Sequence, residues 1–223
     1  MVPVAGALFF VADLDHPVLD AEDAHHAQRV LRLRRGEELT VGDGRGSWRR
    51  VAFAPELVPV DEVVTEPVPD PRLTVAFALV KGTKPEFVVQ KLTEVGVDRI
   101  VPFEAERSVV RWDRDKRERA VLKWRTVARE AAMQSRRAWL PEVVPVTTAQ
   151  DVLGPLGAVR ADMGGRPIAV DDLVVAIGPE GGWSPSEVEL SPDAVVLGPH
   201  VLRAETAAVV AGSLLAGRRI PAS

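Results

Sequence analysis

The sequence contains no cysteine and no long apolar run, and it has only four histidines. Without cysteine the chain can form neither a disulfide framework nor a thiolate metal site. The histidines lack the spacing of zinc ligands, so we expect no metal; they are His16, His25, His26 and His200. No segment approaches the roughly 18 apolar residues of a membrane span, and the first residues do not resemble a secretory signal. We therefore expect a cytoplasmic protein.

Basic residues are concentrated in two segments of a chain whose net charge is −4. Residues 106–137 hold eleven Lys and Arg against five Asp and Glu, and residues 28–50 hold seven against three. Acidic residues gather at 56–70 and 180–193. Two basic segments on an acidic protein fit an RNA-binding surface. Solvated helix faces would give the same pattern, so charge alone leaves both interpretations open.

A proline-rich segment at 66–71 divides the chain into two predicted domains, residues 1–68 and 72–223. Alternating prolines favour an extended, stiff connection and cannot lie in a central strand. Before this segment, short apolar runs separated by glycine turns predict a small β-barrel. Its expected strands lie at 2–12, 39–41, 48–53 and 57–64, with a helix at 20–35.

The second domain has the pattern of an α/β fold with a parallel sheet. An apolar strand at 73–80, an amphipathic helix ending at Gly96 and a strand at 99–103 form a βαβ unit. Capping boxes are predicted at Thr83–Glu86 and Ser184–Glu187. A long basic helix is expected at 113–137 and a last helix at 205–217, whereas residues 141–160 give no strong signal.

Two strands of this domain end in similar glycine–proline loops. The apolar run 173–177 stops at GPEGG (178–182), and the run 194–197 stops at GPHVLRAETA (198–207). Short apolar runs bounded by turn residues are typical of buried strands, and α/β proteins bind ligands where such strands end. No Gly-Lys-Ser/Thr follows, so a phosphate loop is not indicated. Tight strand exits without a ligand would be the plainer interpretation.

Three stretches of the sequence resemble a known family. They are the two loops, the run KGTKPEFVVQKLTEVGVDRIVPFEAERSVV (81–110) and the run HHAQRVLRLRRGEELTVGDGRG (25–46). They are similar to the RsmE family of bacterial 16S rRNA (uracil-N3)-methyltransferases, in the SPOUT superfamily. The resemblance implies an α/β trefoil-knot methyltransferase domain that binds S-adenosylmethionine (AdoMet), preceded by a PUA-like RNA-binding β-barrel. It also implies the 16S rRNA of the small ribosomal subunit as substrate, and a homodimer formed through the knotted domain.

The resemblance further implies which residues bind the cofactor and the RNA. The AdoMet-binding residues would be Ile177, Gly178, Pro179, Gly181, Gly182, Leu197, Gly198, Pro199, Val201, Leu202 and Thr206. The RNA-binding residues would be His25, His26, Arg29, Arg32, Lys81, Lys84, Arg107, Gln134, Arg136 and Arg137. A further strand and cofactor loop should lie within 158–168, where the sequence departs from the family's longer apolar strand and acidic loop.

Arg203 and Glu205 are the predicted catalytic residues, because they follow the second loop and match the family pattern. Uracil N3 must lose its proton as it attacks the methyl carbon, and a cation beside the uracil oxygens favours the anionic base. Arg203 would supply this cation, and Glu205 would accept the proton or orient Arg203. A purely structural Arg–carboxylate bridge is the alternative. His200 replaces the arginine or small residue that is common in the family, and we assign it no role.

Two other functions remain open from the sequence. A SPOUT enzyme that methylates a ribose 2′-hydroxyl would share both glycine loops. A catalytically inactive RNA-binding or ribosome assembly factor would share the fold, although intact loop glycines and an intact Arg203-Ala204-Glu205-Thr206 argue against it.

Two groups of residues have a structural and a functional interpretation. Tryptophans 112, 124 and 139, in or beside the basic helix, could stack on RNA bases, but core or interface anchors are the favoured interpretation. The last helix has a face of small residues, including Ala208 and Gly212, which allows close helix contact. That contact could be a dimer interface or packing within one subunit.

Overall fold

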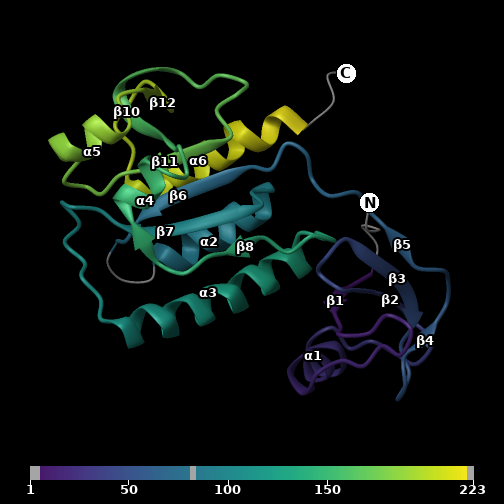
Figure 1. Cartoon of the computed structure of the whole chain (residues 1–223). Helices are drawn as coiled ribbons and strands as arrows, with labels where there is room; N and C mark the ends of the chain where they lie inside the picture. Colours follow the sequence, from purple (N-terminus) through teal and green to yellow (C-terminus); the bar gives the residue numbers. More distant parts are fainter. Residues whose placement is uncertain (1–5, 81–83, 220–223) are drawn as a thin grey trace. The chain divides into compact units, whose positions relative to one another are not determined.

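The computed structural model describes residues 6–80 and 84–219 of the chain (Figure 1). The chain divides into two compact units. One comprises the residues up to 69 together with 130–140, and the other comprises 70–129 together with the residues from 141 onwards. The return of 130–140 to the first unit was not part of the predicted domains. It follows from packing, since Ala132 and Ala138 are buried in one cluster with Leu8 and Trp48.

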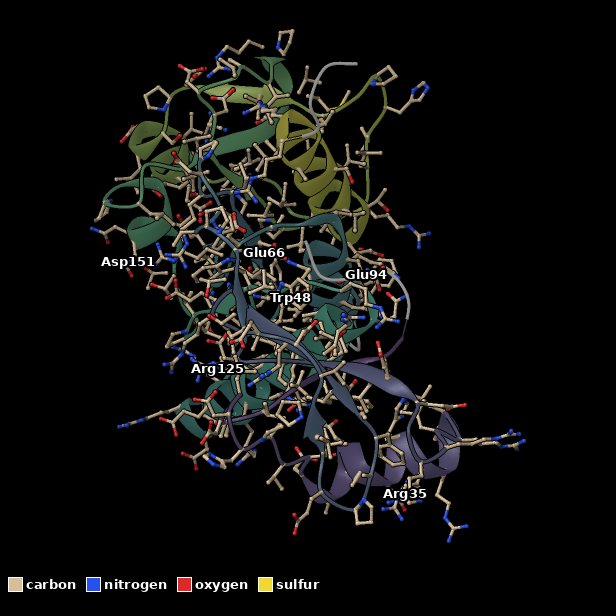
Figure 2. The ribbon with its side chains drawn as sticks, turned by 90° about the vertical axis from the view of Figure 1, so that its right-hand side faces the viewer. Arg35, Trp48, Glu66, Glu94, Arg125 and Asp151 are labelled. Atoms are coloured by element: carbon tan, nitrogen blue, oxygen red, sulfur yellow. The ribbon has the colours of Figure 1, made fainter. Side chains whose placement is uncertain are left out.

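The first unit is built on a five-stranded sheet with the order β1-β2-β3-β4, in which β5 pairs with β3. Its strands are β1 (Leu8–Phe10), β2 (Glu38–Gly42), β3 (Ser47–Ala52), β4 (Val58–Pro59) and β5 (Val64–Thr65). The β1–β2 pair is parallel, and the other pairs are antiparallel. The predicted strand at 2–12 is therefore shorter, and residues 2–5 lie outside the described part. The indole N–H of Trp48, in β3, donates to Glu66 Oε1 at 3.0 Å (Figure 2). This bond attaches the segment after β5 to β3.

The helix predicted at 20–35 is shorter in the structure. Helix α1 (Ala21–His25) begins at Asp20, whose carboxylate accepts the backbone N–H of Asp23 at 2.8 Å. It continues as a π-helical turn, η1 (His26–Val30). Arg32 then adopts φ +54°, a left-handed conformation that reverses the chain before Gly36. Single π-turns occur most often at functional sites.

The second unit contains a sheet with the order β12-β10-β11-β6-β7-β8, in which β9 also pairs with β7. Its strands are β6 (Thr74–Ala78), β7 (Arg99–Glu104), β8 (Glu142–Val143), β9 (Thr147–Thr148), β10 (Val159–Pro167), β11 (Val174–Ile177) and β12 (Ala194–Val196). Every one of these pairs is parallel, which confirms the predicted parallel sheet. Strands β6 and β11 are buried in the centre because near-continuous apolar runs require cover on both faces.

Helices cover this sheet on both faces, as the apolar clusters on its two sides require. They are α2 (Lys84–Val95), α3 (Arg114–Gln134), α4 (Ala149–Leu153), α5 (Pro185–Leu190) and α6 (Ala204–Ala216), followed by a 3₁₀ turn, η2 (Gly217–Arg219). The short elements α4, β8 and β9 lie within 141–160, the segment without a strong sequence signal. The predicted capping residue Thr83 lies outside the described residues.

The small-residue face of α6 packs against α2 within the chain. A Cβ on Gly212 would lie 2.7 Å from Leu92 Cδ2 and 3.1 Å from Val97 Cγ2. Ala208 and Ala211 are fully buried in the same cluster. Packing inside one subunit therefore accounts for this face.

Helix α3 places its central tryptophan in the core. Trp124 is 1% exposed and packs edge-on against Phe77, with ring centroids 6.2 Å apart. The ring centroids of Trp112 and Trp124 are 5.8 Å apart. The Lys116 ammonium lies over the ring of Trp112. The core interpretation is confirmed for Trp124. Within the described ranges, no helix combines the length and apolarity that crossing a membrane requires.

Candidate functional site

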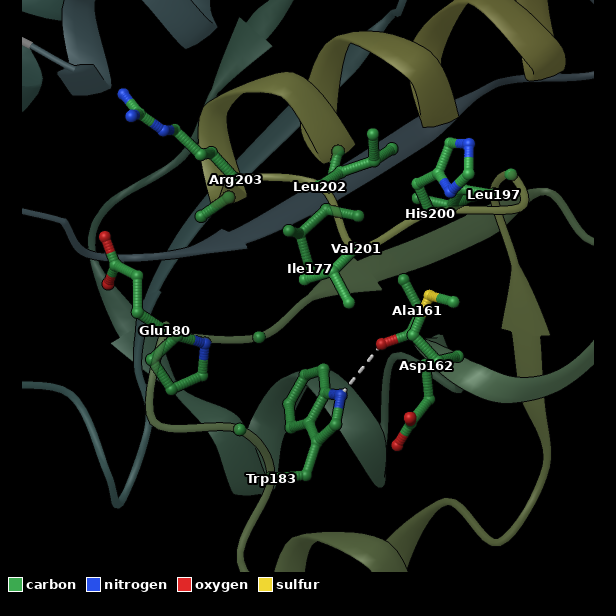
Figure 3. Close-up of a pocket in the computed structure, with 17 residues that line it drawn as sticks. Ala161, Asp162, Ile177, Glu180, Trp183, Leu197, His200, Val201, Leu202 and Arg203 are labelled. Atoms are coloured by element: carbon green, nitrogen blue, oxygen red, sulfur yellow. Dashed lines mark hydrogen bonds between the residues drawn. The ribbon is translucent and has the colours of Figure 1, made fainter.

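The two glycine loops of the second unit enclose a cavity of about 450 Å³ at the carboxyl ends of β11 and β12 (Figure 3). Eight of the predicted cofactor residues line it: Ile177, Gly178, Pro179, Gly182, Leu197, Gly198, Val201 and Leu202. Gly181, Pro199 and Thr206, also predicted, are not among the lining residues. The edge of a parallel sheet where strands end is the usual ligand position in such folds. The two glycine loops singled out in the sequence therefore meet at one cavity, while cofactor binding by these residues stays a prediction.

The first loop requires glycine at two positions. Gly182 has φ +70°, and its N–H donates to the Pro179 oxygen at 2.9 Å, which closes a tight turn. A Cβ on Gly178 would lie 2.9 Å from the Trp183 ring. Gly181 faces away from the cavity, since its Cβ would lie 3.1 Å from the Arg107 oxygen.

Trp183 follows this loop and forms part of the cavity wall. It is 9% exposed, and it stacks on Phe103 with centroids 6.1 Å apart and an interplanar angle of 7°. Its indole N–H donates to the Ala161 oxygen at 3.0 Å (Figure 3). The sequence interpretation missed this residue. Its only signal was an aromatic side chain directly after the glycine loop.

The predicted capping box at the start of α5 is present, and it does more than begin a helix. The Ser184 side chain accepts the Glu187 N–H, while Glu187 Oε2 accepts the Ser184 N–H at 2.8 Å. Glu187 is 3% exposed, and its Oε1 also accepts the Glu106 N–H at 2.8 Å. Hydrogen bonds from Ser184 and then Ser186 lower the pKa of Glu106. The segment after β7 is thereby held beside the first loop.

A third loop of the cavity is a bulge in β10. Ala161 and Arg166 both pair with Val195 of β12, so residues 162–165 leave the ladder. Ala161, Asp162 and Met163 line the cavity. The sequence placed a strand and a cofactor loop within 158–168, and the structure has a strand there with a loop that lines the cavity; its role in cofactor binding stays a prediction. A Cβ on Gly165 would lie 2.6 Å from the Val195 backbone, so only glycine fits there.

The two predicted catalytic residues form no ion pair with each other in the described structure. Arg203 precedes α6, lines the cavity and is exposed. Its guanidinium makes no hydrogen bond or ion pair with any residue in the described ranges, and Figure 3 shows it on the same side of the cavity as Glu180. Glu205 lies 3.3 Å from Lys84 instead.

Lys84 lies between two carboxylates beside the cavity. Its Nζ is 3.3 Å from Glu205 Oε2 and 3.5 Å from Glu180 Oε1. The Glu205 contact is an ion pair without hydrogen-bond alignment, since Oε2 is buried without a hydrogen-bond partner in the described structure. Burial opposes ionisation of Glu205, but its own backbone N–H, Lys84 and Arg203 outweigh it, and the pKa of Glu205 is lowered. Glu205 is thus a stable carboxylate and a weak base.

The predicted RNA-binding residues fall into two groups. His25, His26, Arg29 and Arg32 are all exposed on α1, η1 and the residue-32 turn of the first unit. In the second unit, Lys84 contacts Glu180, and Arg107 donates to the Gly181 oxygen over a long 3.4 Å. Lys81 lies outside the described residues.

The remaining predicted RNA-binding residues lie at the end of α3 and directly after it. Gln134 is exposed, whereas Arg136 and Arg137 are half-buried. Arg136 has φ +60°, and burial lowers its pKa. Its Nη1 is buried and has no hydrogen-bond partner within the described ranges.

Comparisons with known proteins agree with this geometry. Residues 67–216 match the RNA methyltransferase domain family, and residues 19–53 match the RNA methyltransferase PUA domain family. Ribosomal RNA small subunit methyltransferase E from Mycobacterium tuberculosis is 34% identical over 87% of this chain and 83% of its own length. The protein of the same name from Bacillus subtilis is 31% identical over 88% of each chain.

Solved structures give the same result. A putative methyltransferase from Legionella pneumophila, in complex with the bound cofactor SAM, is 27% identical. It superposes with a TM-score of 0.82 and covers 96% of this chain and 98% of its own. A ribosomal RNA small subunit methyltransferase E from Neisseria gonorrhoeae, at 24% identity and a TM-score of 0.74, shares the fold over 94% of this chain and 96% of its own.

Proposed function

Because this chain belongs to the ribosomal RNA small subunit methyltransferase E family, we propose that it methylates N3 of a specific uridine in 16S rRNA. It is an AdoMet-dependent methyltransferase that acts on the RNA of the small ribosomal subunit. What we propose is the position of the methyl group, N3 of one uridine. We also infer a cytoplasmic location, because the substrate is ribosomal RNA.

The cavity fits AdoMet by size and by chemistry. Its volume of about 450 Å³ lies within the usual range for small-molecule sites. Apolar side chains line most of it, and the carboxylates of Asp162 and Glu180 offer hydrogen-bond acceptors to a ligand. A Cβ on Gly198 would meet no atom within 4 Å, so the loop backbone is open to a ligand. When bound, AdoMet supplies an activated methyl group on a sulfonium, and the chain has to align the acceptor.

The free guanidinium of Arg203 at the edge of the cavity carries the proposal. Uracil N3 is a weakly acidic imide, so a cation beside its oxygens stabilises the anion that attacks. Lys84 is already paired with Glu180 and Glu205, which leaves Arg203 available for the base. The lowered pKa of Glu205 makes it an orienting carboxylate rather than the proton acceptor. Arg203 therefore stabilises the anionic base, and Glu205 holds Lys84 beside the loops.

The test is transfer of a labelled methyl group from AdoMet to small ribosomal subunits that lack N3-methyluridine, followed by nucleoside analysis. Label in N3-methyluridine supports the proposal. Label in a 2′-O-methyl nucleoside would contradict it and support methylation of a ribose 2′-hydroxyl instead. If calorimetry shows no AdoMet binding, the inactive assembly factor becomes the better account.

The exposed basic residues of the first unit support an RNA-binding role. His25, Arg29 and Arg32 are on one short segment, without hydrogen bonds from their side chains within the described structure. Such side chains are available to phosphates. We propose the same role for Arg107, Gln134, Arg136 and Arg137, and for Lys81.

We infer a homodimer through the second unit from the family resemblance. The small face of α6 is already covered by α2, so other residues would form that interface. Light scattering coupled to size exclusion tests this, because a monomer at micromolar concentration would contradict it.

A further inference from the structure

The bulge of β10 places one carboxylate at the cavity without a role in the mechanism. Asp162 lines the cavity, and its side chain is 46% exposed. Figure 3 shows it beside Trp183 and away from Arg203, which lies across the cavity. Asp162 and Arg203 therefore lie on different sides of the cavity, and we assign Asp162 to another part of the bound cofactor.

Arg160, two residues earlier, is a buried cation that holds Asp162. Arg160 is 4% exposed, and its Nη1 lies 3.3 Å from Asp162 Oδ2. Its Nε donates to the Ser191 oxygen at 2.6 Å and its Nη2 to the Pro192 oxygen at 3.3 Å. A buried charge is tolerated only when it is paired and hydrogen-bonded. Within the described residues, Asp162 is the one carboxylate in an ion pair with Arg160.

Arg160 also contacts Trp183, which forms part of the cavity wall. Its guanidinium carbon lies 5.9 Å from the centre of the Trp183 ring, a cation–π distance. Trp183 in turn donates to the Ala161 oxygen, at the start of the bulge. One buried side chain thus orients both Asp162 and Trp183.

The charge balance of the pair selects the ligand group. Arg160 already neutralises the Asp162 carboxylate, so a second cation such as an ammonium would bring an uncompensated charge. Neutral hydroxyl donors need only oxygen lone pairs, and Asp162 Oδ1 has no hydrogen bond within the described structure. An acidic side chain that binds ribose hydroxyls at a strand end is a general solution in α/β folds.

We propose that Asp162 accepts hydrogen bonds from the ribose hydroxyls of the bound cofactor, and that Arg160 is its positioning residue. This inference rests on the proposed function, since it takes AdoMet as the ligand. It assigns the end of the cavity opposite Arg203 to the ribose.

Calorimetry with two ligands tests Asp162. AdoMet carries both a ribose and an amino acid, whereas 5′-methylthioadenosine keeps the ribose and lacks the amino acid. Asp162→Asn should raise the Kd of both ligands by about tenfold or more. Asp171→Asn, an exposed neighbour that does not line the cavity, should change neither.

The other outcomes are distinct. If Asp162→Asn weakens AdoMet but not 5′-methylthioadenosine, the carboxylate acts on the amino-acid end or the sulfonium, and the inference is overturned. Unchanged binding of both ligands overturns it as well. Failure of the unaltered protein to bind AdoMet would overturn the proposed function itself.

Kinetics test the positioning role of Arg160. Arg160→Met should raise the KM for AdoMet and leave kcat nearly unchanged, and Arg160→Lys should restore part of the loss. Thermal unfolding of each variant checks that it folds. A variant that loses stability but keeps the KM of the unaltered protein would show that Arg160 is only structural.

Discussion

The indole N–H of Trp183 donates to the backbone oxygen of Ala161 at 3.0 Å. This bond joins the glycine loop after β11 to the bulge of β10. Both segments line the cavity. A change in either loop is therefore transmitted to the other through a side chain that is packed on Phe103 and cannot rotate freely.

Gly178→Ala should weaken AdoMet binding. Its Cβ would lie 2.9 Å from Trp183 Cε2, and the ring cannot yield without losing its bond to Ala161. We expect Kd to rise about tenfold, by calorimetry, because overpacking of such a site costs about 1–3 kcal/mol. Gly217→Ala is the matched control, since its Cβ would meet nothing within 4 Å. Equal Kd values for both variants would contradict the proposed constraint.

Arg203→Ala should lower kcat by about 10²–10³ and leave the KM for AdoMet nearly unchanged. The reason is that, in the proposed mechanism, its guanidinium stabilises charge that develops on the acceptor base during transfer. Steady-state methyl transfer to ribosomal subunits measures both constants. Arg114→Ala removes an exposed arginine paired only with Glu118 and should leave kcat as it is. A loss of AdoMet affinity instead of kcat would reassign Arg203 to cofactor binding.

Asp172→Asn should destabilise the second unit in a pH-dependent way. Hydrogen bonds from Arg166, at 2.6 and 2.8 Å, oppose the effect of burial and lower the pKa of Asp172 below its ordinary 3.8. The stabilisation is therefore present above that ordinary pKa and is lost as the pH falls through the lowered value.

Urea unfolding measures this effect. We expect a difference of about 2 kcal/mol between Asp172→Asn and the unaltered protein near neutral pH, which shrinks only below about pH 4. Asp171→Asn, its exposed neighbour, should give no such difference. A loss that stays constant into acid would show that the carboxylate charge does not contribute.

Gly212→Ala should lower the free energy of unfolding by about 1 kcal/mol. Alanine gains about 1 kcal/mol in helix propensity, but overpacking costs about 1–3 kcal/mol. Overpacking wins here because the nearest neighbour, Leu92, is fully buried and has no room to move. Ser213→Ala, exposed on the same helix, is the control and should change stability by less than about 0.5 kcal/mol. Denaturant unfolding of the two variants shows whether Gly212→Ala raises or lowers the free energy of unfolding.

Arg29→Ala and Arg32→Ala should weaken RNA binding and reduce its salt dependence. Each phosphate contact that is lost lowers the slope of log K against log salt by about 0.7–0.9. Fluorescence anisotropy with a labelled rRNA fragment at several salt concentrations gives this slope. Glu22→Gln, on α1, carries no positive charge and should leave it unchanged. A slope that is the same in all variants would show that these arginines do not contact phosphate.

Sequence signals predicted the parts of the site that depend on local chemistry. The strand β11, the turn at Gly182 and the capping box of Ser184 and Glu187 follow from an apolar run, a glycine and a serine at fixed spacing. The parallel sheet follows from the strand–helix–strand order. These features are decided within a few residues, so the sequence contains them directly.

Contacts between residues far apart in the chain could not be predicted from local sequence patterns. Nothing near Glu205 indicates that it pairs with Lys84 rather than Arg203, because packing of α6 on α2 decides this. The early end of α1 depends on the left-handed turn at Arg32, where no glycine marks it. The return of 130–140 to the first unit likewise depends on apolar contacts with strands more than eighty residues earlier.

Val195 pairs with β10 on both sides of the bulge, at Ala161 and at Arg166. The sheet is therefore the same whether the chain between these two residues is long or short. We therefore expect that residues can be inserted or removed between Ala161 and Arg166 without shifting the strands that carry the glycine loops. Evolution can accordingly change the cofactor side of such enzymes at 162–164 while Gly165 keeps its close approach to β12. The three positions 162–164 are the place to graft new specificity onto this scaffold.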